Sequence, residues 1–503
     1  MIRRISINTD SVRSLELGVS EETVKKFDES SEDNFKLWPE MILLMKIAAP
    51  AVVVQFSVLW IFPLTASVVG RTLGTEALAG FSLGSLVGNL TCLSIMTGAL
   101  TAADILMPRA WGAKNYKEMG IIFIRSVIIC SFLLLIPIIP LFTCMEWIFD
   151  SMGQDKNASH LASVWIRIYI IGVPSALLFR VVQSFLNAQH HVYPMVFASV
   201  LCAYFVHPIL LKFLIPYMGI NGSALAISLT QWIMIGLLFI YLHFKPVERP
   251  ETWPKLSTIS DALRRKPMLD FVSLSLGGVL SLSEWWFWEC VCFIVGTFGV
   301  VPLVVHSIAY NLVPLLFMPT LGMSIGLTVR MGNVLAYDSA KAKLLASWCM
   351  FFTVIFGAIL SCTLFLFRIE IAGLFTDDPE VISGCKEIWP KLCYYIFMLH
   401  VFGINSAILR ALGLQWRMAV IIFSFIWLVT LPNVVYFAVH RGGGLSVVWT
   451  ILPIFYTIMQ FFLVGSYITS DWESIGKAIH KSSHGDQSQK VSIRDDETKK
   501  LIP

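Results

Sequence analysis

The sequence predicts an all-α membrane protein with twelve transmembrane helices in two lobes of six. Composition is the first observation behind this prediction. Hydrophobic residues make up 56% and charged residues 14% of the 503 residues, and the mean hydropathy is +0.73. A soluble domain has roughly 25% charged residues, so a polytopic membrane protein is indicated. The formal net charge of +4 lies mostly in basic loops and predicts no nucleic-acid partner.

The number of long apolar stretches is the second observation. About twelve of them approach or exceed the roughly 20 residues that a helix needs to cross a bilayer. Most of the cysteines lie inside these stretches without metal-ligand spacing, so we expect packing thiols and no metal site. The predicted spans are 41–69, 78–106, 119–149, 161–187, 192–216, 222–244, 268–298, 301–330, 343–372, 383–411, 417–440 and 444–470.

A weak internal repeat is the third observation. Leu186–Gln189 resembles Leu412–Gln415, and Val69–Gly74 resembles Val295–Gly299, each about 225 residues further on. Because six is an even number, two such lobes keep the same orientation and are related by a pseudo-two-fold axis along the membrane normal. Transporters built in this way bind their substrates near mid-membrane, between or within the repeats.

The distribution of charge suggests the domain organisation. Lys and Arg collect on one side of the predicted helices if the N-terminus is cytoplasmic, and an even helix count places both termini there. The first residues lack the apolar core of a signal peptide. We predict a cytoplasmic tail at 1–40, an N-terminal lobe at 41–244, a cytoplasmic inter-lobe loop at 245–267, a C-terminal lobe at 268–470 and a second cytoplasmic tail at 471–503.

Two acids stand out within the predicted span 268–298. Glu284 and Glu289 enclose four aromatic residues there. A charged side chain in hydrocarbon costs about 2.5 kcal/mol or more, so such acids are functional-site candidates. A structural ion pair is the alternative, but no Lys or Arg occurs from Met268 to Val329, so a partner would come from another helix. At about 100° per residue the two acids lie roughly 140° apart and face different neighbours unless the helix bends.

These residue types suggest how the site could work. A proton and a cationic substrate both neutralise an ionised carboxylate, so they compete for it. Competition at a site that opens alternately to the two sides of a membrane gives antiport. Aromatic side chains beside the acids would add a cation–π attraction of about 0.5–2 kcal/mol each with little demand on substrate shape.

Several motifs together resemble one family. Gln55, Asn89, the Glu284–Glu289 stretch, Val329–Asn333 and Phe375–Glu380 follow one another in an order that resembles the multidrug and toxic compound extrusion (MATE) family, eukaryotic branch. The resemblance covers about residues 41–470. It implies a two-lobed antiporter that exports organic cations or other amphipathic compounds in exchange for protons, with the proton as coupling ion and no other cofactor.

The resemblance also implies roles for particular residues. Glu284 and Glu289 match the acids for proton coupling and cation binding, and the implied cavity residues are Gln55, Asn89, Trp285, Trp288, Tyr310, Phe317 and His400. The sequence departs from the family at some of these positions. Trp288 and Phe317 stand where animal relatives have tyrosine, and Leu399, beside His400, replaces an acid. His400 could titrate in that acid's place, or it could be a core histidine.

Other classes of function stay open at this stage. A lipid or polar-metabolite carrier would share the helix count and the repeat, but it would not need an acid pair walled by aromatic rings. An enzyme is not expected, because no nucleophile, zinc or phosphate-loop motif occurs in a plausible context. The expected partners are protons, small organic cations and the bilayer, and we expect a monomer.

The end of the sequence bears on localisation. Glu497–Pro503 resembles the acidic dileucine signals that clathrin adaptors bind, with Leu501 and Ile502 as the apolar pair. The plasma membrane is the predicted location, and endosomal, lysosomal or vacuolar membranes are the alternative.

Overall fold

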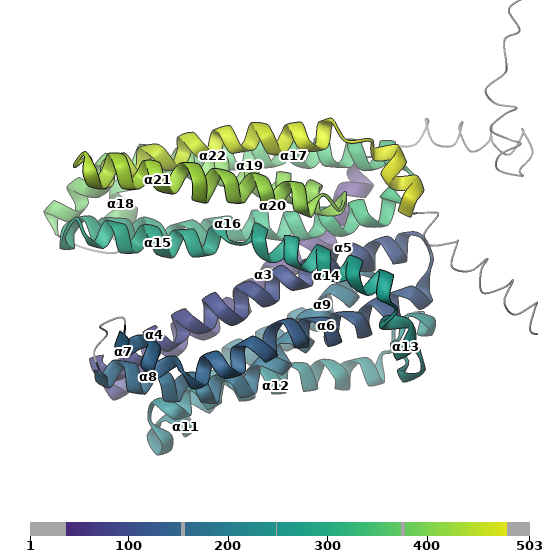
Figure 1. The fold of residues 1–503 in the computed structure, drawn as a ribbon, viewed down its shortest axis with the longest axis horizontal. Coiled ribbons are helices and arrows are strands. Elements are labelled where there is room, and N and C mark those ends of the chain that lie inside the picture. Colours follow the sequence, from purple (N-terminus) through teal and green to yellow (C-terminus); the bar gives the residue numbers. More distant parts are fainter. Residues whose placement is uncertain (1–36, 152–155, 248, 374–377, 480–503) are drawn as a thin grey trace, which may run out of the picture. The chain divides into compact units, whose positions relative to one another are not determined.

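The structure, a computed structural model, describes residues 37–151, 156–247, 249–373 and 378–479. Within these ranges every regular element is a helix and no strand occurs. Twelve helical segments are long and apolar enough to span a membrane. Figure 1 shows these segments as long helices, most of them running in roughly the same direction. The predicted all-α fold class and the predicted number of spans are therefore confirmed.

Six spans make up the first half of the chain. They are formed by α3 (Leu37–Leu73); α4 (Thr75–Gly88), the π-helical turn η1 (Asn89–Leu93) and α5 (Ser94–Gly112); α6 (Tyr116–Thr143); α8 (Lys156–Tyr169), η2 (Ile170–Gly172) and α9 (Val173–Ala188); α10 (Tyr193–Leu201), η3 (Cys202–Val206) and α11 (His207–Met218); and α12 (Ile220–Phe244).

Six further spans make up the second half. They are formed by α14 (Arg265–Ser281) and α15 (Glu284–Gly296); α16 (Val300–Leu335); α17 (Ser339–Leu366); α19 (Pro379–Ala411); α20 (Gln415–Phe423), η6 (Ser424–Thr430), α21 (Leu431–Val434) and η7 (Val435–His440); and α22 (Gly444–Ile468). The predicted boundaries of the lobes at 244 and 268 stay a prediction, because short helices between Pro250 and Ala262 continue toward α14.

Two of the predicted spans are too long at their C-terminal ends. The third helix stops at Thr143 and the ninth at Leu366, because Cys144 and Phe367 leave the helical conformation with ψ angles of 4° and 23°. The chain then forms the short helices α7 (Met145–Ser151) and α18 (Arg368–Gly373). Both turns are apolar, so hydropathy alone could not reveal them. The same turn and short helix recur at matching places in the two halves.

Helix capping repeats in the same way. The side chain of Asn115 accepts a hydrogen bond from the backbone N–H of Glu118 at 3.3 Å, at the start of α6. The side chain of Asp338 accepts one from the backbone N–H of Lys341 at 2.8 Å, at the start of α17. Such N-caps satisfy backbone donors that a helix leaves unpaired. The third span of each half thus begins with the same device.

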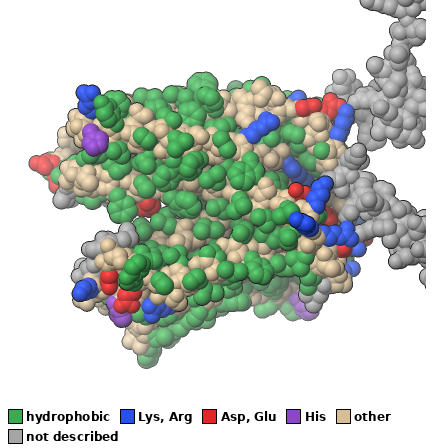
Figure 2. All heavy atoms as spheres, viewed as in Figure 1, with side chains coloured by type: hydrophobic (Ala, Val, Ile, Leu, Met, Phe, Trp, Pro, Cys, Tyr) green, Lys and Arg blue, Asp and Glu red, His purple; other side chains and the backbone are tan. Residues whose placement is uncertain are grey.

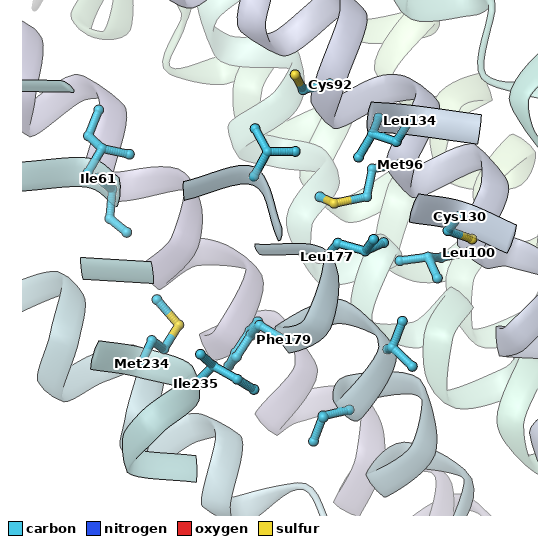
Figure 3. Close-up of a cluster of buried hydrophobic side chains, with 14 of the residues drawn as sticks. Ile61, Cys92, Met96, Leu100, Cys130, Leu134, Leu177, Phe179, Met234 and Ile235 are labelled. Atoms are coloured by element: carbon cyan, nitrogen blue, oxygen red, sulfur yellow. The ribbon is translucent and has the colours of Figure 1, made fainter. Parts of the chain in front are cut away.

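Each half has a hydrophobic core of its own. The first is built almost entirely from α3 to α12, and the second from α15 to α22. Figure 3 shows part of the first core, in which Cys92 and Cys130 lie among aliphatic, methionine and phenylalanine side chains. All ten cysteines are free, and no group of metal-binding side chains occurs among the described residues. The cysteines in these cores pack as small apolar side chains, as expected.

The outer surface of the described helices suits a lipid environment. Large apolar side chains such as Phe132, Phe239 and Phe461 are exposed. Figure 2 shows hydrophobic side chains over most of the visible face, with Lys and Arg gathered mainly toward the right end. An apolar surface of this extent would be unfavourable in water and is favourable in a bilayer.

Close backbone contacts join the two halves. On α14, a Cβ atom added to Gly278 would lie 2.2 Å from the carbonyl oxygen of Gly98 on α5. On α16, a Cβ added to Gly322 would lie 2.7 Å from the carbonyl oxygen of Ala48 on α3. Glycines permit such close approach of membrane helices. The first span of each half therefore packs against the second span of the other, as a pseudo-two-fold relation requires (Figure 1).

Candidate functional site

The span that carries the two acids is broken. Helix α14 ends at Ser281 and α15 begins at Glu284, with a turn at Leu282 and Ser283. In this turn the N–H of Trp285 bonds the carbonyl of Leu282 at 3.0 Å. Glu284 is thus the first residue of a new helix, where the unpaired N–H groups and the helix dipole favour a carboxylate.

Glu284 lies inside the second half of the chain. Its side chain is only 7% exposed. The hydroxyl of Tyr456 on α22 donates a short hydrogen bond to its Oε1. The ring of Tyr456 in turn packs edge-on against Tyr395 of α19, with centroids 4.8 Å apart. This carboxylate is therefore held by the last helix and enclosed by aromatic rings.

Glu289 occupies a different environment. It is half-buried, and the hydroxyl of Tyr310 on α16 donates a hydrogen bond to its Oε1 at 3.0 Å. The two acids therefore face different helices, α22 and α16, as their spacing predicted. Neither carboxylate forms an ion pair with a Lys, Arg or His among the described residues. The structural ion pair that was the alternative does not occur within this part of the chain.

Trp288 lies between the two acids at the centre of a group of rings. We call Trp288, His306, Tyr310, Tyr395, Trp449 and Tyr456 the aromatic cluster. The centroid of Trp288 is 5.3 Å from that of Tyr395, 6.0 Å from that of Trp449 and 6.3 Å from that of Tyr310. The tyrosine donors of both acids belong to this cluster, so one continuous set of rings connects Glu284 with Glu289.

The other two tryptophans of the stretch behave differently from each other. Trp285 is 42% exposed and makes no ring contact within the described residues. The indole N–H of Trp286 lies 3.1 Å from the hydroxyl of Ser94 and 3.3 Å from the carbonyl of Leu90, both in the first half. The π-helical turn at Asn89–Leu93 shifts the backbone hydrogen bonds here, and such turns are frequent at functional sites.

Gln55 and Asn89 lie in the first half, on α3 and at the start of η1. Both are half-buried, and the side-chain oxygen of Asn89 has no hydrogen-bond partner within the described residues. Neither forms a hydrogen bond with Glu284 or Glu289 there. The structure therefore brings Trp286, rather than these two predicted residues, into direct contact across the halves.

Neither Phe317 nor His400 makes a hydrogen bond or a ring contact with the two acids or the aromatic cluster within the described residues. A Cβ added to Gly403 would lie 3.0 Å from the ring of Phe317, so that ring packs between α16 and α19. His400 is fully buried, its Nδ1 lies 2.7 Å from the carbonyl oxygen of Ile396, and its ring packs against Phe356 of α17. Its Nε2 has no hydrogen-bond partner within the described residues, and a titrating role for His400 stays a prediction.

The sequence reasoning missed Tyr395, Trp449 and Tyr456. Trp449 and Tyr456 are seven residues apart, which places them on one face of a helix. That spacing was a signal, but nothing in it indicated that the face would meet Glu284. Residues 375–377 of the Phe375–Glu380 motif lie outside the described residues. The same holds for the tail residues Leu501 and Ile502.

Two repeated halves of six spans, with uncompensated acids enclosed in one half, define a polytopic membrane transporter. The MatE family model matches residues 50–213 and 278–435, which is more than half of the chain. The chain belongs to the MATE family. Members of this family are transporters and not enzymes, so the expectation of a transporter is confirmed.

Relatives with curated descriptions cover most of the chain. An uncharacterized transporter of Schizosaccharomyces pombe is 28% identical over 91% of this chain and 86% of its own length. Multidrug and toxin extrusion protein 1 of Homo sapiens is 27% identical over 86% of this chain and 75% of its own length. For the protein of the same name from Danio rerio the identity is 27%, over 75% of this chain and 63% of its own length.

Solved structures share the fold. The crystal structure of the eukaryotic MATE transporter AtDTX14 matches with a TM-score of 0.81 and 20% identity, over 89% of this chain and 99% of that one. An outward-facing multidrug resistance MATE family transporter matches with a TM-score of 0.73 and 19% identity, over 86% and 96%. At these identities the likeness concerns the fold.

Proposed function

We propose that the chain is a secondary active antiporter that exports organic cations in exchange for protons by alternating access. The observation that carries this proposal is the pair of carboxylates on α15. Glu284 and Glu289 each accept a hydrogen bond from a tyrosine, and neither has a basic partner within the described residues. Names such as multidrug and toxin extrusion protein, borne by relatives, support the direction of transport.

The physical reason is the cost of an unpaired charge. An ionised carboxylate removed from water and without a cationic partner is unfavourable, and binding a proton or a cation relieves that cost. A site that holds one of the two at a time exchanges them whenever it opens to a side where the other is more abundant. Glu284 and Glu289 supply the charge, and the conformational change of the two halves supplies the access.

The aromatic cluster supports organic cations as the exchanged substrate. The faces of Trp288, Trp449 and Tyr310 present negative electrostatic potential. Tyr310 donates a hydrogen bond to Glu289, and Trp288 packs against both Tyr310 and Trp449. A quaternary or protonated amine gains about 0.5–2 kcal/mol from each well-placed ring. This attraction depends little on the shape of the amine, which suits a broad range of substrates.

Purified protein in lipid vesicles tests the proposal. An outward or inward pH gradient should drive exchange of radiolabelled tetraethylammonium. Glu284→Gln and Glu289→Gln should each lower the initial rate about tenfold or more, a loss of at least 1.4 kcal/mol. The matched control is Glu387→Gln, which changes an exposed glutamate on α19 of the same half and should leave the rate within about twofold.

Two results would contradict the proposal. The first is unchanged proton-driven exchange in both acid variants between pH 6 and pH 8. The second is transfer of a fluorescent phospholipid or a neutral polar solute between the two sides without any effect of the pH gradient, which would favour the lipid or polar-metabolite carrier instead.

We propose the plasma membrane as the site of action, with a monomer as the working unit, because one chain holds both halves and both acids. Sorting to endosomal, lysosomal or vacuolar membranes through a clathrin adaptor is the alternative, and Leu501 and Ile502 lie outside the described residues. Replacing both by alanine should raise the surface-labelled fraction if the tail sorts, and should leave it unchanged if it does not. Light scattering of purified protein would show a second copy if the monomer proposal were wrong.

A further inference from the structure

We propose that His306 is a further proton-binding group of this site, and that its protonated ring competes with the organic cation for the aromatic cluster. The proposal rests on the antiport function proposed above and adds a specificity-determining residue to it. His306 lies on α16 and is fully buried.

His306 occupies the place that an organic cation would favour. Its ring centroid is 5.7 Å from that of Trp449, 6.2 Å from that of Tyr310 and 6.3 Å from that of Trp288. Its plane is tilted by 25° from Trp288 and by 28° from Tyr310, so these pairs are stacked. An imidazolium stacked on two ring faces, with Trp449 tilted by 50° beside it, is an internal organic cation at about the 6 Å range of cation–π attraction.

Only one ring nitrogen of His306 has a hydrogen-bond partner within the described residues. Nε2 lies 3.4 Å from the Sγ atom of Cys292, whereas Nδ1 has no hydrogen-bond partner among the described residues. The indole N–H of the neighbouring Trp449 also lacks a partner there. Buried polar atoms are nearly always paired in folded proteins, so two unpaired ones in adjacent rings point to a place that binds something.

A second buried histidine shows what a purely structural one looks like. His207, in the first half, is also fully buried, but one ring nitrogen lies 2.8 Å from the hydroxyl of Thr65 and the other 2.9 Å from that of Thr230. Both nitrogens of His207 are engaged by neighbours. His306 differs from His207 in having one ring nitrogen without a partner, a feature that it shares with His400, whose Nε2 is also unpaired within the described residues.

The charged and titratable groups around His306 come from several helices. On α15, Glu289 and Cys292 are three residues apart and share a face. On α16, His306 and Tyr310 are four residues apart and share a face, and they contact Cys292 and Glu289, respectively. Tyr395 of α19 and Tyr456 of α22 complete the cluster on the side of Glu284. No Lys or Arg occurs from Met268 to Val329, so the fixed charges that α15 and the adjoining part of α16 can present are negative. A positive charge lies nearby on α19, where Lys391, one turn before Tyr395, donates hydrogen bonds to the carbonyl and the hydroxyl of Ser446 on α22.

Protonation of Glu289 and protonation of His306 change the affinity for an organic cation in the same direction. Burial makes a bare charge on His306 costly, while the stacked rings of Trp288 and Tyr310 and the carboxylate of Glu289 stabilise it. Protonating Glu289 removes a negative charge from the site, and protonating His306 adds a positive one. Both changes disfavour a bound organic cation, so the two groups act together when the site opens to the more acidic side.

Histidine NMR tests the proposal directly. Purified protein with isotope-labelled histidines is titrated between pH 5 and pH 8, and the signal that disappears in His306→Gln identifies the residue. We expect this signal to titrate, and saturating tetraethylammonium should shift its midpoint to lower pH. By linkage, acidification from pH 7.5 to pH 5.5 should weaken tetraethylammonium binding about fivefold more in the unmodified chain than in His306→Gln.

Controls separate this proposal from a structural role. His243→Gln changes an exposed histidine on α12 and should leave the steepness of the pH dependence unchanged. If His306→Gln does not fold, His306→Asn or the signal perturbed by Cys292→Ala assigns the resonance. A His306 signal that stays constant from pH 5 to pH 8 would overturn the proton site.

The remaining outcomes are also decisive. A midpoint that tetraethylammonium does not move would overturn the competition, even if the histidine titrates. Absence of proton-driven tetraethylammonium exchange by the unmodified chain would contradict the antiport proposal instead. The vesicle assay measures this exchange independently of the histidine titration.

Discussion

The two halves of the chain have the same helical plan but different chemistry. In the first half, Asp104 accepts a hydrogen bond from Ser184 and interacts electrostatically with Arg180, so its charge is compensated. In the second half, Glu284 and Glu289 have tyrosine donors and no basic partner within the described residues. The same helical plan thus holds one acid with a basic neighbour and two acids without one, so the candidate site is located by the charges and not by the repeat.

The largest effect on transport is expected from substitutions at the close contact between the two halves. A Cβ added to Gly112 would lie 2.1 Å from the carbonyl oxygen of Asn333, and one added to Gly278 would lie 2.0 Å from the hydroxyl of Thr101. An added methyl group in a packed contact costs about 1–3 kcal/mol, and it would destabilise the conformation in which the halves touch at these glycines. Gly112→Ala and Gly278→Ala should therefore lower vesicle exchange of tetraethylammonium about tenfold or more.

The matched control for these variants is Gly236→Ala on α12. A Cβ at that position has no atom within 4 Å, so exchange should remain close to that of the unmodified chain. Normal exchange by both Gly112→Ala and Gly278→Ala would show that the close contact of the halves is not part of the transport cycle.

The two tyrosine donors give an intermediate effect. Tyr456→Phe removes the hydrogen bond to Glu284, which is only 7% exposed, whereas Tyr310→Phe removes the one to the half-buried Glu289. A hydrogen bond to a charged group contributes about 1.5–3 kcal/mol. Thermal unfolding in detergent should therefore show a larger loss for Tyr456→Phe, with the exposed Tyr217→Phe as control. Equal losses would mean that the two acids are equally accessible.

The smallest effect concerns the short helices that follow the third span of each half. On α7, Glu146 lies 2.9 Å from Nδ1 of His160, and this contact, with help from Ser163 and Arg167, lowers the pKa of Glu146 below its ordinary value of 4.5. A lowered carboxyl pKa stabilises the fold above pH 4.5, and that stabilisation disappears as the pH falls through the lowered value.

Because this pair is exposed, its effect on the unfolding temperature should be small, below about 2 °C. Glu146→Gln should lower that temperature slightly at neutral pH and flatten its dependence on acid. Glu370 on α18 is exposed and has no hydrogen bond or ion pair within the described residues, so Glu370→Gln should change nothing. A matching change in both variants would remove the distinction between α7 and α18.

The sequence predicted some features of the site and could not predict others. Counting residues along one helix was enough to expect that Glu284 and Glu289 face different neighbours. The partner of Glu284 could not be inferred, because Tyr456 lies on a helix that is remote in sequence and no local pattern encodes that contact. The sequence leaves open a bend in the span 268–298 but does not show where it lies, because the turn at Leu282 and Ser283 contains no proline.

The turn also sets the orientation of the tryptophans. Helix α15 starts anew at Glu284, so the turn determines how α15 is rotated about its own axis. As a result Trp285 is exposed and Trp286 contacts the first half. The order and number of the spans were predictable because they depend on composition, while the orientation of each side chain depends on packing that composition does not specify.

The turn at Leu282 and Ser283 forms a joint between α14 and α15. Helix α14 packs on α5 of the first half and on α20, whereas α15 packs on α16, and the two meet at this joint. With 17 residues at 1.5 Å each, α14 is about 25 Å long, so a rotation of roughly 10° at the joint moves its far end by about 4 Å. Glu284 is the first residue beyond the joint. A proton or cation bound to its carboxylate would therefore lie next to this joint, and a small rotation of the joint would move the far end of α14 by several ångströms.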